Sequence, residues 1–176
     1  RLKCKRLLGK ERRNNRRHAV NTVIILRGVP GSGKSSFVKM LKDTNSDITV
    51  HAIDDLHVDE NGDFFWKEGE QDKLYLLNYC NFVNSMKDQM PLIVVDCINV
   101  KASDFSDYIQ AARMFNYHVY VVTPDMPNVD DAAKRNKHHV SSLQIKQMYK
   151  DWEPWPSQDD LNKKIRDCKK NETTNY

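Results

Sequence analysis

The chain has 176 residues, of which 39% are hydrophobic, so it suffices for one domain with a continuous core and leaves no room for a second catalytic domain. Its longest apolar runs have four or five residues, far fewer than the roughly 20 that cross a bilayer, and it shows no signal-peptide pattern. The cysteines are scattered and lack zinc-ligand spacing, which indicates reduced thiols of an intracellular protein: Cys4, Cys80, Cys97 and Cys168.

The net charge of +4 is unevenly distributed. Residues 1–17 carry nine basic residues and one acid, a net charge of +8, whereas the remainder has 19 basic and 23 acidic residues, a net charge of −4. Such a basic run is typical either of a solvated arm or of a contact with nucleic acid, and the sequence leaves both open. The chain begins with Arg1 rather than Met, so we expect it to be a piece of a longer polypeptide with further domains.

A phosphate-binding loop follows the first predicted strand, residues 23–26, and precedes a predicted helix that includes residues 36–41. Its glycines let backbone N–H groups turn inward around a phosphate, and the helix directs its positive N-terminus at the same anion. Lys34 is expected at the β- and γ-phosphates and Ser35 at Mg²⁺. The pattern therefore predicts binding of a nucleoside triphosphate, ATP or GTP, by Gly28, Gly31, Ser32, Gly33, Lys34, Ser35 and Ser36.

Strands and helices then alternate along the chain. Residues 48–52, 92–95 and 118–122 predict three further strands, and residues 71–87, 129–136 and 142–152 predict helices. The helix at 71–87 shows an apolar stripe of Leu76, Tyr79, Cys80, Val83 and Met86. Another helix is expected to be capped by Ser103 and to pack through Phe105, Tyr108, Ile109 and Ala112.

This alternation predicts an α/β fold of three layers, with a mostly parallel sheet of four to five strands covered by helices on both faces. Ligands bind such sheets at the carboxyl ends of the strands, where Gly28, Asp54 and Asp96 all fall. We expect a basic arm at residues 1–20, this domain at 21–156 and a polar tail at 157–176.

Several candidate residues have both a functional and a structural interpretation. The pair Asp54-Asp55 suits a catalytic base or a turn, and Asp96 suits acceptor positioning with a water-mediated Mg²⁺ contact or a cap. The aromatic residues 64–66 could stack on a base or anchor a loop. The basic run at residues 134–139 could form a lid over the phosphates or a solvated face.

The ordered series of motifs resembles the polynucleotide-kinase-like P-loop kinases, the group that includes the kinase half of the phage 5′-end-healing enzyme. The resemblance covers about residues 21–153 and rests on the segment 26–35, Asp54-Asp55, Asp96 with Asn99, Arg135-Asn136 with His138, and Met148-Tyr149. It implies a P-loop kinase that uses ATP and Mg²⁺.

The resemblance also assigns roles. Lys34 and Ser35 would hold ATP and Mg²⁺, Asp54 would be the general base for a 5′-hydroxyl, and Arg135 would be a lid arginine on the donor phosphates. Asp96 would position the acceptor, with Asn99 and His57 as further acceptor contacts. The sequence departs from the phage enzyme in having His57 and His139 at two arginine positions and one extra residue in Asp96-Cys97-Ile98-Asn99.

The leading hypothesis is therefore an ATP-dependent kinase for the 5′-hydroxyl of RNA or DNA, with the basic arm contributing to nucleic-acid binding and no membrane partner. A kinase for a small hydroxylated metabolite is the first alternative, because the same fold serves many acceptors and residues 18–176 are net acidic. A non-catalytic nucleotide-binding module of a larger RNA-processing protein is the second.

Overall fold

A four-stranded parallel sheet forms the centre of the molecule. The computed structural model describes residues 20–57, 69–137 and 140–155. The strands have the spatial order β2-β3-β1-β4 and comprise β1 (Thr22–Leu26), β2 (Ile48–Ala52), β3 (Leu92–Asp96) and β4 (His118–Val122). All neighbouring pairs are parallel. The predicted strands are confirmed, and the described part of the chain holds four of the expected four to five.

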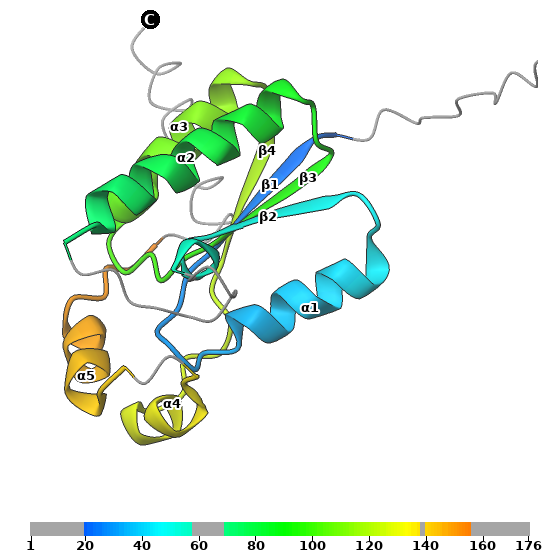
Figure 1. Cartoon of the computed structure of the whole chain (residues 1–176). Helices are drawn as coiled ribbons and strands as arrows, with labels where there is room; N and C mark the ends of the chain where they lie inside the picture. The colour runs from blue at the N-terminus through cyan, green and yellow to red at the C-terminus, as the bar shows by residue number, and fades with distance from the viewer. Residues whose placement is uncertain (1–19, 58–68, 138–139, 156–176) are drawn as a thin grey trace, which may run out of the picture.

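Helices cover both faces of this sheet (Figure 1). Helix α1 (Lys34–Thr44) lies on one face, where Val38 packs with Leu26 and Val94. Helices α2 (Gln71–Lys87) and α3 (Ser106–Met114) lie on the other, over a cluster that includes Val23, Ile25, Ile93 and Val95. Successive residues of a strand point to opposite faces of the sheet, so β1 and β3 contribute buried side chains to the core clusters on both faces. The predicted three-layer α/β fold is confirmed.

Two shorter helices lie beyond the carboxyl ends of the strands (Figure 1). Helix α4 (Val129–Arg135) begins after Asn128, whose side chain accepts a hydrogen bond from the backbone N–H of Asp131. Helix α5 (Ser142–Lys150) begins with a capping box between Ser141 and Gln144. Val29, Ala132 and Ile145 form a buried cluster, so the two helices pack on the segment that follows β1.

The register of the sheet brings three strand ends level. Asp96 is the paired partner of Leu26 in β1 and of Ala52 in β2. The loop after β1, the 3₁₀ helix η1 (Asp54–Leu56) after β2 and the loop after β3 therefore leave the sheet at the same edge. Among the described residues, no helix is long and apolar enough to cross a membrane.

The buried face of helix α2 matches the predicted stripe only in part. Its buried residues are Leu74, Asn78, Phe82 and Met86, spaced four apart. Of the predicted stripe, Met86 is buried and Tyr79 and Val83 are partly buried against the core, whereas Leu76 is 63% exposed and Cys80 is also exposed. The predicted stripe omits Asn78, because hydrophobicity alone does not mark an asparagine as buried; its amide donates to the hydroxyl of Tyr108 at 3.1 Å.

Helix α3 also begins later than predicted. Ser103 lies within a short 3₁₀ helix, η2 (Ala102–Asp104), and α3 starts at Ser106. The carboxylate of Asp104 accepts from the backbone N–H of Lys101 at 2.9 Å, which stabilises this extra turn. The predicted packing residues are nevertheless buried: Phe105, Tyr108, Ile109 and Ala112.

Candidate active site

The loop of residues 28–33 joins β1 to the N-terminus of α1. A Cβ atom at Gly28 would lie 2.3 Å from the hydroxyl oxygen of Ser32, so any larger residue would force the Ser32 side chain to move. That hydroxyl is buried, and the described atoms provide it with no hydrogen-bond partner. The Ser32 hydroxyl could donate a hydrogen bond to a phosphate oxygen, and the loop lies at the positive N-terminus of a helix. Both features suit a phosphate at this place.

Lys34, the first residue of α1, folds back over this loop. Its ammonium donates to the backbone carbonyl of Gly28 at 2.8 Å and to that of Val29 at 3.2 Å. Burial lowers the pKa of Lys34, while the negative charges of Asp96 and Asp54 act in the opposite direction. Lys34, Asp54 and Asp96 therefore form one electrostatic cluster at the level ends of β1, β2 and β3.

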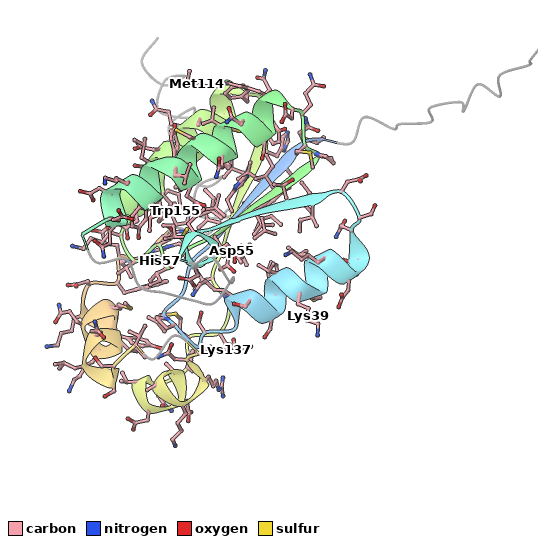
Figure 2. All side chains as sticks on the ribbon, in the orientation of Figure 1. Lys39, Asp55, His57, Met114, Lys137 and Trp155 are labelled. Carbon is pink, nitrogen blue, oxygen red and sulfur yellow. The ribbon has the colours of Figure 1, made fainter. Side chains whose placement is uncertain are left out.

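The two carboxylates differ in their surroundings. Asp54 opens η1 and is exposed, and its backbone carbonyl accepts from the N–H of His57 at 3.1 Å. Asp96 ends β3 and is half-buried. Figure 2 shows Asp55 and His57 in the same region, beyond the carboxyl end of β2. An exposed carboxylate beside a partly buried cation can accept a proton from a substrate that enters from solvent.

The neighbouring Cys97 is not a reactive group. It is 7% exposed, and burial raises the pKa of its thiol to about 12, with the charges of Asp96 and Asp54 adding to the effect. A neutral, buried thiol is neither a good nucleophile nor a good metal ligand. Cys97 therefore contributes packing between the sheet and α2 rather than chemistry.

Magnesium could be held by Ser35 and Asp96 only together with other ligands. Within the described part of the chain, no group of three or more His, Cys, Asp or Glu residues could hold a metal ion. Ser35 is exposed in the first turn of α1, and Asp96 ends strand β3. One hydroxyl and one carboxylate suit a Mg²⁺ ion that completes its octahedral shell with water and substrate phosphates.

Two predicted acceptor contacts are buried. Asn99 is 3% exposed, and its amide donates to the backbone carbonyl of Leu26 at 2.7 Å. His57 is 1% exposed. These positions give both residues a role in shaping the site, and direct contact with an acceptor remains a prediction.

Arg135 is the last residue of α4 and is exposed, and Lys137 follows shortly after it (Figure 2). Helix α4 touches the phosphate loop directly, because a Cβ atom at Gly31 would lie 2.3 Å from the carbonyl oxygen of Ala132. Arg135 therefore starts from a helix that rests on the loop it is predicted to cover. His138, His139 and the aromatic residues 64–66 lie outside the described residues.

Sequence reasoning missed two residues of this region. Arg27, directly before the loop, is 1% exposed and hydrogen-bonded to three backbone carbonyls. Tyr75 of α2 is 45% exposed, and partial burial of its side chain raises its pKa, with the charges of Asp104 and Asp54 acting in the same direction. No local pattern marks the burial of Arg27, because its hydrogen-bond partners belong to distant segments.

The fold and the candidate site define an α/β domain with a phosphate-binding type of loop after its first strand. In structure the chain is similar to a chain of the Pnkp1/Rnl/Hen1 RNA repair complex, with a TM-score of 0.62 and 19% identity over 78% of this chain and 45% of that chain. It is also similar to a gluconokinase from Sinorhizobium meliloti 1021, with a TM-score of 0.51 and 17% identity over 80% of both chains. The predicted P-loop kinase fold is thereby confirmed.

Two human proteins are similar in sequence. YLP motif-containing protein 1 is 27% identical over 157 residues, which cover 76% of this chain and 7% of that protein. NEDD4-binding protein 2 is 25% identical over 138 residues, which cover 77% of this chain and 8% of that protein. The chain thus spans less than a tenth of the length of either relative. No protein-family model matches it.

Proposed function

We propose that this domain transfers the γ-phosphoryl group of ATP to the 5′-hydroxyl of RNA or DNA. The observation that carries the proposal is the cluster of Lys34, Asp54 and Asp96 at the level ends of three parallel strands, next to a loop that fits a phosphate. Phosphoryl transfer requires mainly positioning and neutralisation of charge, together with a base for the acceptor proton.

Each side chain has a role in this reaction. Lys34 binds the β- and γ-phosphates, and Arg135 neutralises charge on the transferred group from the side of α4. Asp96 orients the acceptor, and Asp54 accepts the proton as the hydroxyl oxygen bonds to the γ-phosphorus and the bond to the β-phosphate oxygen breaks, releasing ADP. Ser35 and Asp96 would hold Mg²⁺, which would supply further neutralisation of the phosphate charge.

The nucleic-acid acceptor is supported by two observations. The similarity with a TM-score of 0.62 is to a chain of an RNA repair complex. Residues 1–17, outside the described part of the chain, carry a net charge of +8 and precede β1 by only a few residues. A basic arm there could bind the phosphates downstream of a 5′ end while Asp54 receives the terminal hydroxyl.

Two alternatives also have support. The gluconokinase similarity extends over 80% of both chains, which favours a small hydroxylated acceptor. The human relatives contain the matched region as a small fraction of a long protein, which suits a nucleotide-binding module that recruits or gates other domains.

Transfer of label from γ-labelled ATP to a 5′-hydroxyl oligonucleotide tests the proposal. The matched control is the same oligonucleotide with a 5′-phosphate, which should remain unlabelled, and Lys34→Ala should abolish labelling. RNA, DNA and gluconate are compared in parallel. Labelling of gluconate alone would establish the metabolite kinase, and tight Mg-ATP binding without transfer to any acceptor would favour the non-catalytic module.

A further inference from the structure

Arg27 joins three segments that are far apart in the sequence. It follows β1 and precedes the first loop glycine, and only 1% of it is exposed. Its Nε donates to the backbone carbonyl of Asn99 at 2.9 Å, and its Nη2 donates to those of Val100 at 2.7 Å and Glu153 at 2.8 Å. The guanidinium thus links the loop after β3 and the segment after α5 to the phosphate loop.

Aromatic rings hold the guanidinium in place. The Cζ of Arg27 lies 4.3 Å from the ring centroid of Trp152 and 4.9 Å from that of Phe105. Burial lowers the pKa of Arg27, while the charges of Asp104 and Glu153 act in the opposite direction. The guanidinium is planar and donates to three backbone carbonyls, so it fixes the positions of its partners more strictly than the flexible ammonium of a lysine would.

Further hydrogen bonds tie the same segments together. The backbone N–H of Glu153 donates to the carbonyl of Val100 at 3.2 Å, and its carboxylate accepts from the N–H of Ala102 at 2.7 Å. The N–H of Gly28 donates to the carbonyl of Ile98 at 2.9 Å. The end of α5 is therefore joined to the entry of the phosphate loop through the loop after β3.

The other end of the α4–α5 pair rests on the same loop. The carbonyl of Ala132 abuts Gly31, and Val29 packs against Ala132 and Ile145. Arg135 lies three residues after Ala132 and hence on a neighbouring part of the same helical face. The pair is thus anchored at two points, and we expect a change at one anchor to alter the orientation of the helix that presents Arg135.

We propose that Arg27 is a positioning residue that, through Trp152 and the backbone of Glu153, sets where α4 and α5 place Arg135 over the donor phosphates. This inference rests on the proposed function, because it assigns Arg27 an effect on the same transfer step. Arg27 itself touches no substrate. Its effect is on orientation, and a misplacement of about 1 Å can lower a rate by ~10²-fold.

The test uses Trp152, because Arg27→Met removes a buried charge network and could prevent folding. Trp152→Leu removes one ring from the guanidinium and leaves the hydrogen bonds of Arg27 available. We expect kcat to fall by ~10- to 100-fold with the KM for ATP nearly unchanged. In an Arg135→Ala background the same substitution should cause no further loss, since Arg135 is the group being positioned.

Trp155→Leu is the matched control. The ring of Trp155 packs edge-on against Phe105 with centroids 4.9 Å apart, so this variant removes an indole from the same cluster and leaves both rings that contact Arg27 in place. Its kcat should stay close to that of the wild type. Equal losses in both tryptophan variants, or a full additional loss from Trp152→Leu when Arg135 is alanine, would overturn the proposal.

A second readout does not require turnover. In the full chain, Mg-ATP should slow tryptic cleavage after Lys134 and Arg135, because the nucleotide engages this end of α4. The protection should persist in Trp155→Leu and be lost in Trp152→Leu, even if no acceptor is phosphorylated and the proposed function fails. Equal protection in all three proteins, or none in the wild type, would contradict the positioning role of Arg27.

Discussion

The backbone carbonyl of Ala132 occupies the space that a side chain at position 31 would fill. A Cβ atom at Gly31 would lie 2.3 Å from that oxygen, and Gly31 has a φ of 80°, in the left-handed region that favours glycine. The phosphate loop and α4 thus meet backbone to backbone. Because of this contact, the loop that is proposed to bind the donor and the helix that carries Arg135 can influence each other directly.

Gly31→Ala tests this contact. The substitution combines an unfavourable backbone conformation with a clash against a main-chain atom, so we expect the free energy of unfolding to fall by about 1–3 kcal/mol or more. Gly33→Ala is the control, because Gly33 has a φ of 92° but no atom lies within 4 Å of the point where its Cβ would be. In urea titrations Gly31→Ala should be the less stable variant; equal stabilities would contradict the steric account.

Lys34→Ala should abolish binding or turnover of the nucleoside triphosphate. The substitution removes the ammonium that the loop carbonyls of Gly28 and Val29 hold beside the phosphate site. Calorimetric titration with Mg-ATP measures the loss directly. Lys39→Ala, which removes an exposed lysine from the same helix, should bind normally. Tight binding and unchanged turnover by Lys34→Ala would remove the basis of the proposed function.

Asp54→Asn should separate chemistry from binding. It keeps the size and polarity of the side chain but loses proton acceptance, which typically costs ~10²–10⁴ in rate. The affinity for ATP should barely change, since the donor is bound by the phosphate loop. Asp55→Asn is the matched variant one residue along η1. A larger loss in Asp55→Asn would move the base to Asp55, and no loss in either would favour the non-catalytic module.

His51 should make the domain less stable in mild acid. It is 8% exposed, its Nε2 is hydrogen-bonded to the hydroxyl of Ser85 at 3.0 Å, and burial lowers its pKa. Below about pH 6.5 the unfolded chain takes up a proton that the folded His51 resists, so the free energy of unfolding decreases as the pH falls. Above that pH the effect is absent.

Urea unfolding at about pH 7.5 and 5.5 measures this dependence. His51→Gln should lose less stability than the wild type between the two values, because it has no imidazole to protonate. His118→Gln, which removes an exposed histidine from β4, controls for the loss of a histidine as such. An unchanged pH dependence in His51→Gln would contradict the assignment.

The basic arm makes a salt-dependent prediction. If residues 1–17 contact nucleic-acid phosphates through four or five of their cations, they should contribute roughly −3 to −4 to the slope of log affinity against log salt concentration. Deleting the arm should flatten that slope and leave phosphorylation of a very short oligonucleotide nearly intact. Unchanged affinity and slope for long RNA and DNA would identify the arm as a solvated linker.

Local patterns predicted most of the fold, and they also carry the proposal for the donor half of the site. Gly28, Lys34 and Ser35 are recognisable because the phosphate loop is a contiguous segment whose chemistry depends on near neighbours. The acids at the end of β3 and just past β2, Asp96 and Asp54, were predictable for the same reason, since an acid that follows a strand-like run is a local feature. Parallel strands end at the same edge of the sheet, so the sequence also predicted that these acids lie near the phosphate loop. The register of the sheet then fixed that Asp96 lies opposite Leu26 and Ala52.

Tertiary structure alone decided the rest. Asn78 faces the core because its amide finds Tyr108 and Cys97, and a pattern based on hydrophobicity places asparagine outside. Arg27 is buried because the backbone carbonyls of Asn99, Val100 and Glu153 accept its hydrogen bonds. These partners lie 72, 73 and 126 positions further along the chain. Contacts at such separations leave no periodic trace in the sequence, because each depends on how distant segments are packed together by the sheet and its helices.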